Sequence, residues 1–175
     1  MTAPPLPGRV RQVGFVVRDF ESAIQSWLAA GVGPWFVIRN VPLDCVYRGA
    51  PCEVTVTTGL ANIGDMQIEL IAQHDATPSI YTEFLSSGRE GYHQIAWWTD
   101  DFDAALGAAT AAGWLVVWSG VGPGGLRFAY AEPAGGVATV YEISETNDGV
   151  AAFYEHIRAE ADDWDGSDPI RSLEF

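Results

Sequence analysis

The sequence predicts an α+β fold in which two β-α-β-β-β modules pair as a curved mixed sheet around one cavity. The first observation is an internal repeat, in which QVGFVVRDFESAIQSWLAAG at 12–31 returns as QIAWWTDDFDAALGAATAAG at 94–113. The second is that each copy has the pattern of a strand followed by a helix, and the third is that three strand-like segments follow each copy. Only two long copies are present, which indicates a pair of facing modules rather than a solenoid.

The repeat and the composition between its copies divide the chain into five expected segments. They are a proline-rich arm at 1–8, the first module at 9–73, a linker at 74–91, the second module at 92–145, and an acidic helix and tail at 146–175. At 175 residues the chain is long enough for one domain with a well-buried core.

The first module is expected to begin with a strand at 10–17, where apolar residues alternate with others. Asp19 is a suitable N-cap for a helix that continues to Leu28, and Gly31 is a suitable residue to end it. The helix should bury its apolar stripe, which consists of Ala23, Ile24, Trp27 and Leu28. Strand patterns follow at 35–39, 53–58 and 67–71.

The second module repeats this order, starting with a strand at 93–99 and a helix that Asp101 should cap. That helix should extend to Ala112, and strands should follow at 115–119, 127–131 and 139–144. The linker should contain a short helical stretch at 80–85. An additional helix is expected at 148–161, and the last dozen residues are expected to be irregular.

Charge and composition exclude several classes of function. The net charge is −14, and the nine cationic side chains are all Arg. The acidity disfavours nucleic-acid binding, and the absence of Lys excludes a mechanism that uses a Schiff-base lysine. The chain has no apolar run long enough for a membrane span, and its N-terminus lacks the apolar core of a signal peptide, so we expect a cytoplasmic protein. Cys45 and Cys52 match no zinc spacing and are expected to be reduced thiols.

Four polar residues occupy positions that the repeat relates to each other. Glu69 and Glu142 each lie on the last strand of a module, and Gln12 and Gln94 each begin the first strand. Carboxylates inside a strand-rich core need compensation for their charge, and one divalent cation would compensate for two of them. The alternative is that each side chain caps a sheet edge and faces solvent. Because all four positions are related by the repeat, we favour their convergence on one site.

The paired modules, the V-x-D-F-x-x-A helix start at 17–23 and the closing strands that carry Glu resemble the vicinal oxygen chelate superfamily. Its members include glyoxalase I, methylmalonyl-CoA epimerase, extradiol dioxygenases and bleomycin-resistance proteins. The resemblance covers about residues 9–145 and implies a homodimer with a divalent metal in each site. The implied metal ligands are Gln12, Glu69, Gln94 and Glu142.

The sequence departs from both of these relatives at one ligand position, Gln94, and from methylmalonyl-CoA epimerase also at Gln12, where that enzyme carries His. Gln94 stands where glyoxalase I and methylmalonyl-CoA epimerase carry His, and the neighbouring His93 should point the other way on a strand. Ligands that are all oxygen suit Mg²⁺ or Mn²⁺ better than Zn²⁺, and Co²⁺ and Ni²⁺ stay among the alternatives. An extradiol dioxygenase is disfavoured because its Fe(II) needs two His. No nucleotide cofactor is expected, since no Lys follows the GPGG turn at 122–125.

Six further residues on or beside predicted strands are candidates for substrate binding. They are Trp35, Arg39, Tyr92, Trp98, Arg127 and Tyr130. The alternatives are core packing for the aromatic residues and surface ion pairs for the two Arg. Seven Trp residues in a chain of this length favour a hydrophobic or aromatic ligand.

Two functions fit these features. The first is an isomerase, epimerase or lyase in which Glu142 or Glu69 moves a proton next to a carbonyl group, with a metal or without one. The second is a metal-free protein of the same architecture that binds and sequesters an aromatic ligand. Both act on a small molecule, and neither needs a nucleic-acid or membrane partner.

Overall fold

The structure is a computed structural model that describes residues 6, 8–133, 135 and 140–173. It confirms the α+β fold class and the repeated element order. The first module comprises β1 (Gln12–Val16), α1 (Phe20–Ala29), β2 (Trp35–Tyr47), β3 (Ala50–Ile63) and β4 (Met66–Gln73). The second comprises β5 (Gly91–Thr99), α3 (Phe102–Ala111), β6 (Leu115–Val121), β7 (Arg127–Glu132) and β8 (Val140–Glu145). Three further elements are α2 (Ile80–Ser86), α4 (Asp148–Asp162) and β9 (Ile170–Ser172).

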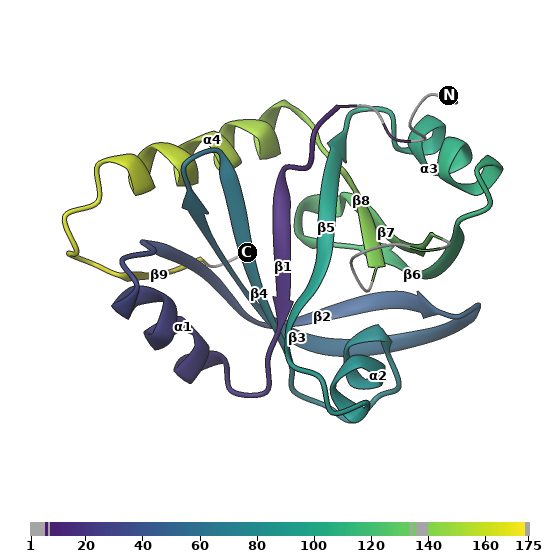
Figure 1. The fold of residues 1–175 in the computed structure, drawn as a ribbon, viewed down its shortest axis with the longest axis horizontal. Helices are drawn as coiled ribbons and strands as arrows, with labels where there is room; N and C mark the ends of the chain where they lie inside the picture. The colour runs from purple at the N-terminus through teal and green to yellow at the C-terminus, as the bar shows by residue number, and fades with distance from the viewer. Residues whose placement is uncertain (1–5, 7, 134, 136–139, 174–175) are drawn as a thin grey trace.

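The strands form one mixed sheet that closes on itself. Their order is β3-β4-β1-β5-β8-β7-β6-β2, and β2 pairs again with β3 to complete the ring, while β9 adds to β2. The two modules meet where β1 and β5 pair antiparallel, and each of these strands pairs in parallel with the last strand of its own module. Figure 1 shows α4 lying across one end of this curved sheet and α2 at the opposite end.

The two modules repeat in their local chemistry as well as in their order. Asp19 and Asp101 both cap a helix, accepting a hydrogen bond from the backbone three residues on. Gly31 and Gly113 both follow the helix with a φ near +80°, a conformation that side chains other than glycine rarely adopt. The same local signals therefore begin and end both helices, as the repeat predicts.

β2 and β3 are much longer than predicted. The pattern at 35–39 predicts a short strand, whereas β2 continues to Tyr47 and pairs with β3 along its length. A register irregularity between Ile38 and Val41, with Asn40 at a φ of 53°, interrupts the alternation there. The hairpin partner supplies the hydrogen bonds that continue the strand beyond this point. The local alternation of apolar residues therefore predicts too short a strand for β2.

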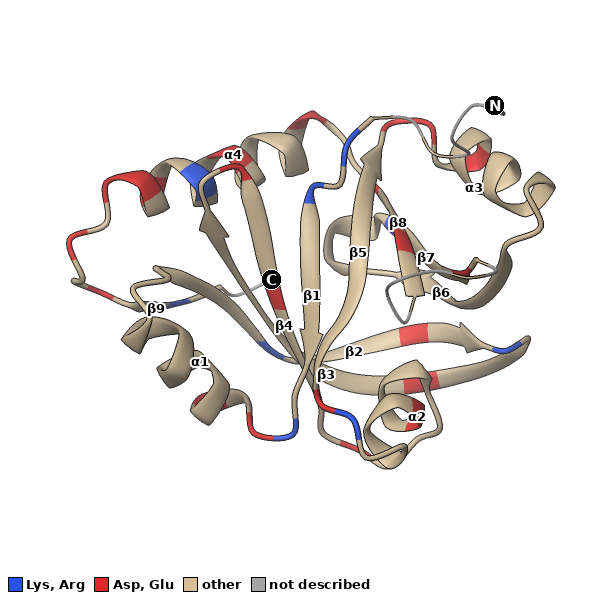
Figure 2. Cartoon of the chain, viewed as in Figure 1, with Lys and Arg blue, Asp and Glu red and all other residues tan. Residues whose placement is uncertain are grey.

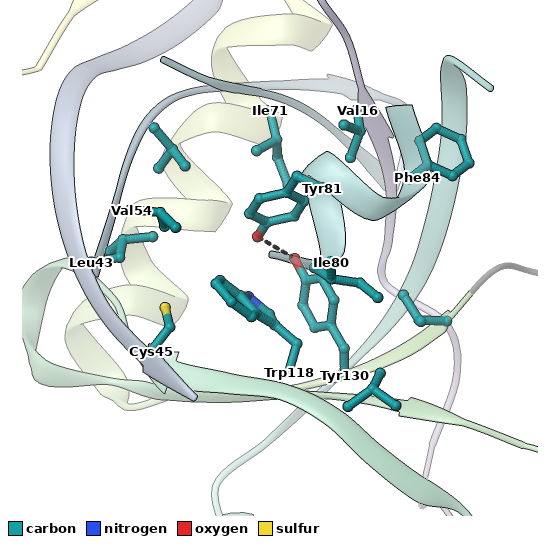
Figure 3. Close-up of a cluster of buried hydrophobic side chains, with 13 residues drawn as sticks. Val16, Leu43, Cys45, Val54, Ile71, Ile80, Tyr81, Phe84, Trp118 and Tyr130 are labelled. Carbon is teal, nitrogen blue, oxygen red and sulfur yellow. Dashed lines mark hydrogen bonds between the residues drawn. The ribbon is translucent and has the colours of Figure 1, made fainter. Parts of the chain in front are cut away.

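The predicted linker contributes to the core. Ser79 caps α2, and the helix buries Ile80, Tyr81 and Phe84 in a cluster with residues of both modules. Figure 3 shows Tyr81 pointing toward Tyr130 of β7 within this cluster. The linker thus carries a helix that fills one end of the closed sheet.

The C-terminal segment follows one prediction and contradicts another. The predicted helix at 148–161 is present as α4, and its Ile157 is fully buried against Phe36 of β2. The last dozen residues were expected to be irregular, which was wrong for part of them, because Ile170–Ser172 forms β9 beside the start of β2. The open edge of β2 supplies the pairing that the sequence of this short strand does not reveal. Of the predicted arm, Leu6 is buried against α3.

Acidic residues are spread over the outer helices and loops, and α4 and the segment after it carry many of them (Figure 2). Within the described part of the chain, no helix is long and apolar enough to cross a membrane.

Candidate functional site

A cavity of about 510 Å³ lies inside the closed sheet. Its walls come from both modules and from α4. The polar part of the lining includes Gln12, Glu69, Tyr81, Tyr130, Glu142 and Ser144. Most of the remaining surface is apolar and includes Ile38, Leu43, Val56, Leu60, Ile71 and Phe153. The cavity therefore combines a small acidic and hydroxylic cluster with hydrophobic walls, as small-molecule sites do.

Sheet register brings the two repeat-related Glu residues to the same place. Gly14 of β1 lies opposite Glu69 in β4 and also opposite Gln94 in β5. The equivalent position in the second module, Ala96 of β5, lies opposite Glu142. Both carboxylates therefore stand beside the pair of central strands, one from each side, and both line the cavity.

The amide nitrogen of Gln94 connects the two carboxylates. Gln94 Nε2 lies 3.3 Å from Glu69 Oε2, 3.5 Å from Glu142 Oε2 and 3.2 Å from the hydroxyl of Tyr130. Two N–H hydrogens are thus shared among three oxygens. Ser144 donates a hydrogen bond of 2.6 Å to the other oxygen of Glu142. Gln12 lies in the same cluster, but its amide nitrogen donates to Gln67 instead, at 2.8 Å.

Strand alternation predicts that His93 points away from Gln94, but in the structure the two side chains lie on the same side. The β1–β5 register passes from Gly14 opposite Gln94 to Phe15 opposite Tyr92, so His93 is an extra residue in a β-bulge. The bulge turns His93 inward, where it is fully buried beside the rings of Tyr81, Phe84 and Tyr130. Its Nδ1 lies 2.6 Å from Gln94 Oε1. Burial lowers the pKa of His93 to about 4, so the imidazole is neutral at pH 7.

Gly14 provides the space in which the Gln94 amide lies. A Cβ at this position would stand 2.1 Å from Gln94 Nε2 and 2.2 Å from its Cδ. Gly14→Ala is therefore expected to push the amide away from the carboxylates and to destabilise the protein by about 1–3 kcal/mol. Urea unfolding measures the loss. Gly107→Ala in α3 is the control, since its Cβ would meet nothing within 4 Å. Equal stability of the two variants would contradict this account of Gly14.

The two carboxyl groups have raised pKa values. Burial is the main cause for both. The nearby charge of Glu142 raises the pKa of Glu69 further, whereas hydrogen bonds from Ser144, Gln94 and Tyr130 oppose the rise at Glu142, whose pKa is about 7. Like charges this close cannot both ionise readily, so the pair tends to hold one proton near neutral pH.

The residues present do not fit a divalent metal in the observed arrangement. Glu69, Glu142 and Gln12 line the cavity and could each offer oxygen, but Gln94 turns its nitrogen toward the carboxylates. The amide oxygen, which is the only ligating atom of that side chain, is bonded to His93 instead. No cluster of three His, Cys, Asp or Glu side chains suited to a metal occurs among the described residues.

The predicted substrate-binding residues separate into two groups. Tyr130 and Arg127 line the cavity, although Arg127 is bonded to Glu145 and Asp103. Trp98 does not line the cavity, but its ring packs on the ring of Tyr154, and Tyr154 does line the cavity.

The other three candidates lie elsewhere. Trp35 is buried in the core beneath α1, where its indole donates to Val32. Arg39 forms an ion pair with Glu21, and Tyr92 is 41% exposed next to Phe15. The local pattern of a strand shows which side chains share a face, but it does not show which face encloses the cavity.

The sequence reasoning missed three residues around the carboxylates. Tyr81 of α2 and Tyr154 of α4 lie outside the repeat, so no symmetry pointed to them. The charges of Glu69 and Glu142 contribute to a raised pKa at both hydroxyls, after the larger contribution of burial. Gly14 carried a usable signal, because an isolated glycine inside a strand often marks a close approach.

These features define an α+β protein with paired modules and two buried carboxylates in a largely apolar cavity. The profile of the Glyoxalase/Bleomycin resistance protein/Dioxygenase superfamily matches residues 11–130. The chain belongs to this superfamily, which confirms the resemblance in the sequence.

Solved structures with the same fold include methylmalonyl-CoA epimerases. The enzyme from Mycobacterium tuberculosis is 22% identical, with a TM-score of 0.59 over 87% of this chain and 97% of that one. The Streptomyces coelicolor enzyme (E43L) in complex with 2-nitronate-propionyl-CoA is 19% identical, with a TM-score of 0.57 over 80% and 95%. A hypothetical protein from Bacillus halodurans C-125 is 17% identical, with a TM-score of 0.58 over 80% and 95%. No curated protein matches the sequence.

Proposed function

We propose that this protein is an isomerase or epimerase that moves a proton on the carbon next to a carbonyl group. The observation that carries the proposal is the pair of buried carboxyl groups from Glu69 and Glu142, which face one cavity and contact one amide. Membership of the superfamily and the fold shared with epimerases support the same class of reaction.

The raised pKa values suit the two Glu residues to proton transfer near neutral pH. Glu142, with a pKa of about 7, serves as the base that removes the proton, and Glu69, in its protonated form, as the acid that returns one. The hydroxyl of Tyr81, 3.2 Å from that of Tyr130, also lines the cavity and can donate to the oxygen that becomes negative in exchange for its bond to Tyr130. After one turnover Glu142 carries the proton and Glu69 is ionised. One proton must then pass from Glu142 to Glu69, directly or through solvent, to restore the starting state.

The substrate is expected to be small, largely apolar and without a negative charge. Arg127 is the cation among the described cavity residues, and two carboxylates already hold its guanidinium. A substrate carboxylate would therefore meet Glu69 and Glu142 without a free cation to balance it. The epimerases with this fold are named for methylmalonyl-CoA. For the protein described here we propose a neutral ketone, aldehyde or ester as the substrate.

Proton exchange in D₂O tests the proposal directly. The wild-type protein should catalyse exchange of the α-proton of a neutral, apolar carbonyl compound, seen by loss of its NMR signal. The matched acid of similar size should exchange at least about tenfold more slowly, since one uncompensated charge costs more than 1.4 kcal/mol in a buried site. Absence of exchange with every carbonyl compound in a panel would contradict an enzymatic role.

The second candidate is a protein that binds and sequesters a hydrophobic ligand. The apolar walls and the closure by α4 favour it. Binding measured by calorimetry without any exchange in D₂O would support this alternative. The homodimer and the cytoplasmic location stay predictions, which sedimentation and localisation of a tagged chain can test.

A further inference from the structure

The two Gln residues related by the repeat use their amides differently. Gln12 Nε2 donates along the sheet to Gln67 Oε1. Gln94 Nε2 is surrounded by three oxygens, from Glu69, Glu142 and Tyr130. The residue before Gln12 is Arg11, whereas the residue before Gln94 is His93, which the bulge brings to the same side. The difference between the two amides therefore coincides with the bulge.

The hydrogen bonds define the direction of the Gln94 amide. In the opposite direction its oxygen would lie among the oxygens of Glu69, Glu142 and Tyr130, and the site would lose the two N–H donors of the amide. In the observed direction its nitrogen donates to them, and its oxygen lies 2.6 Å from His93 Nδ1. This contact is a hydrogen bond only if Nδ1 carries the proton of the neutral imidazole. Among the residues that the structure describes, His93 Nε2 has no hydrogen-bond partner, and the ring lies beside aromatic side chains, which fits an unprotonated nitrogen.

We infer that His93 is a positioning residue that holds the Gln94 amide as a hydrogen-bond donor to the Glu69–Glu142 pair and thereby excludes a metal ion from it. The amide hydrogens occupy the place between the carboxylates where a cation would otherwise balance their charge. For a metal to bind all four repeat-related residues, Gln94 would have to turn its oxygen inward. Its nitrogen could then donate to His93 Nδ1 only if the imidazole proton moved to the buried Nε2, which has no partner among the described residues. The bulge that places His93 is therefore the feature that separates this site from a metal centre.

This inference deepens the proposed function, because it assigns the means by which the same carboxylate pair works without metal. It rests on the proposed function only in taking Glu69 and Glu142 to be the groups that transfer the proton. Its tests measure the tautomer of His93 and the affinity for a metal, and neither requires turnover. The inference can therefore fail while proton exchange is observed, and it can hold while no exchange is observed.

The tautomer of His93 is the first test and needs no variant. Nitrogen NMR of the wild-type protein with ¹⁵N-labelled histidine should show a neutral imidazole protonated at Nδ1. Protonation at Nε2 would remove the donor to Gln94 and overturn the inference.

Metal affinity is the second test, with Mn²⁺ as the probe because it prefers oxygen ligands. His93→Phe keeps an aromatic ring in the aromatic pocket but removes the hydrogen bond. It should raise the affinity for Mn²⁺ by at least about tenfold, because the amide oxygen of Gln94 becomes free to act as a ligand. The control is His74→Gln, which removes a different His bond, to Thr57, and should not change the affinity. Tight binding of Mn²⁺ by the wild-type protein, or equal affinity of wild type and His93→Phe, would overturn the inference.

Discussion

Replacing Glu142 with Gln is expected to lower the rate of α-proton exchange by about 10²- to 10⁴-fold, the usual contribution of a general base. Gln has nearly the same shape, and its amide oxygen can still accept the hydrogen bond from Ser144. The fold should therefore persist while the basic group is lost. The rate of solvent deuterium incorporation, measured by NMR at saturating substrate, gives the effect.

Glu53→Gln is the matched control for this variant. Glu53 is an exposed carboxylate on β3 and does not line the cavity, so its loss should leave exchange unchanged. Retention of more than about a tenth of the wild-type rate in Glu142→Gln would rule out the role of principal base, since a general base contributes at least about a hundredfold.

Glu69→Gln is expected to stabilise the protein relative to wild type, increasingly as the pH rises from about 4.5 through 7. Both carboxyl groups have folded-state pKa values above those of the unfolded chain. Such groups stabilise the fold fully below their unfolded pKa, and the contribution disappears as the pH passes their folded pKa. At pH 8 the Glu69→Gln protein should therefore be more stable than wild type, and at pH 5 the difference should be much smaller.

Urea unfolding at several pH values measures this effect. Burial of the neutral His93, whose pKa is lowered to about 4, acts in the opposite direction over part of this range. It is present in both proteins, so the difference between Glu69→Gln and wild type isolates the effect of the carboxyl pair. Glu53→Gln again supplies the control. A Glu69→Gln protein that is less stable than wild type at pH 8 would show that the pair is compensated, for example by a cation.

Several parts of the fold could be predicted because their causes are local. Asp19 and Asp101 cap helices through contacts within three residues, and the apolar stripe around Ile24 defines the buried face of α1. β2 could not be predicted beyond Arg39, since pairing with β3 sustains it past an irregularity. β9 depends on a partner more than 130 residues away in the chain.

The candidate site divides in the same way. Glu69 and Glu142 could be identified because the repeat places them at equivalent positions, and a duplicated module repeats its geometry. Tyr81 and Tyr154 could not, because they reach the cavity from helices that belong to neither copy. Trp35 was selected for its residue type and strand position, but it packs beneath α1 because the cavity lies on the other side of the sheet.

The sequence by itself determined the duplicated α+β architecture, the superfamily and the pair of carboxylates, since all of these follow from residues repeated at a constant spacing. Only the tertiary structure decided what stands between the carboxylates. A bulge one residue long turns His93 toward Gln94, and Gly14 on the neighbouring strand leaves room for the amide. Strand alternation cannot predict this, because a bulge depends on how two strands pair and reverses the face that a side chain occupies.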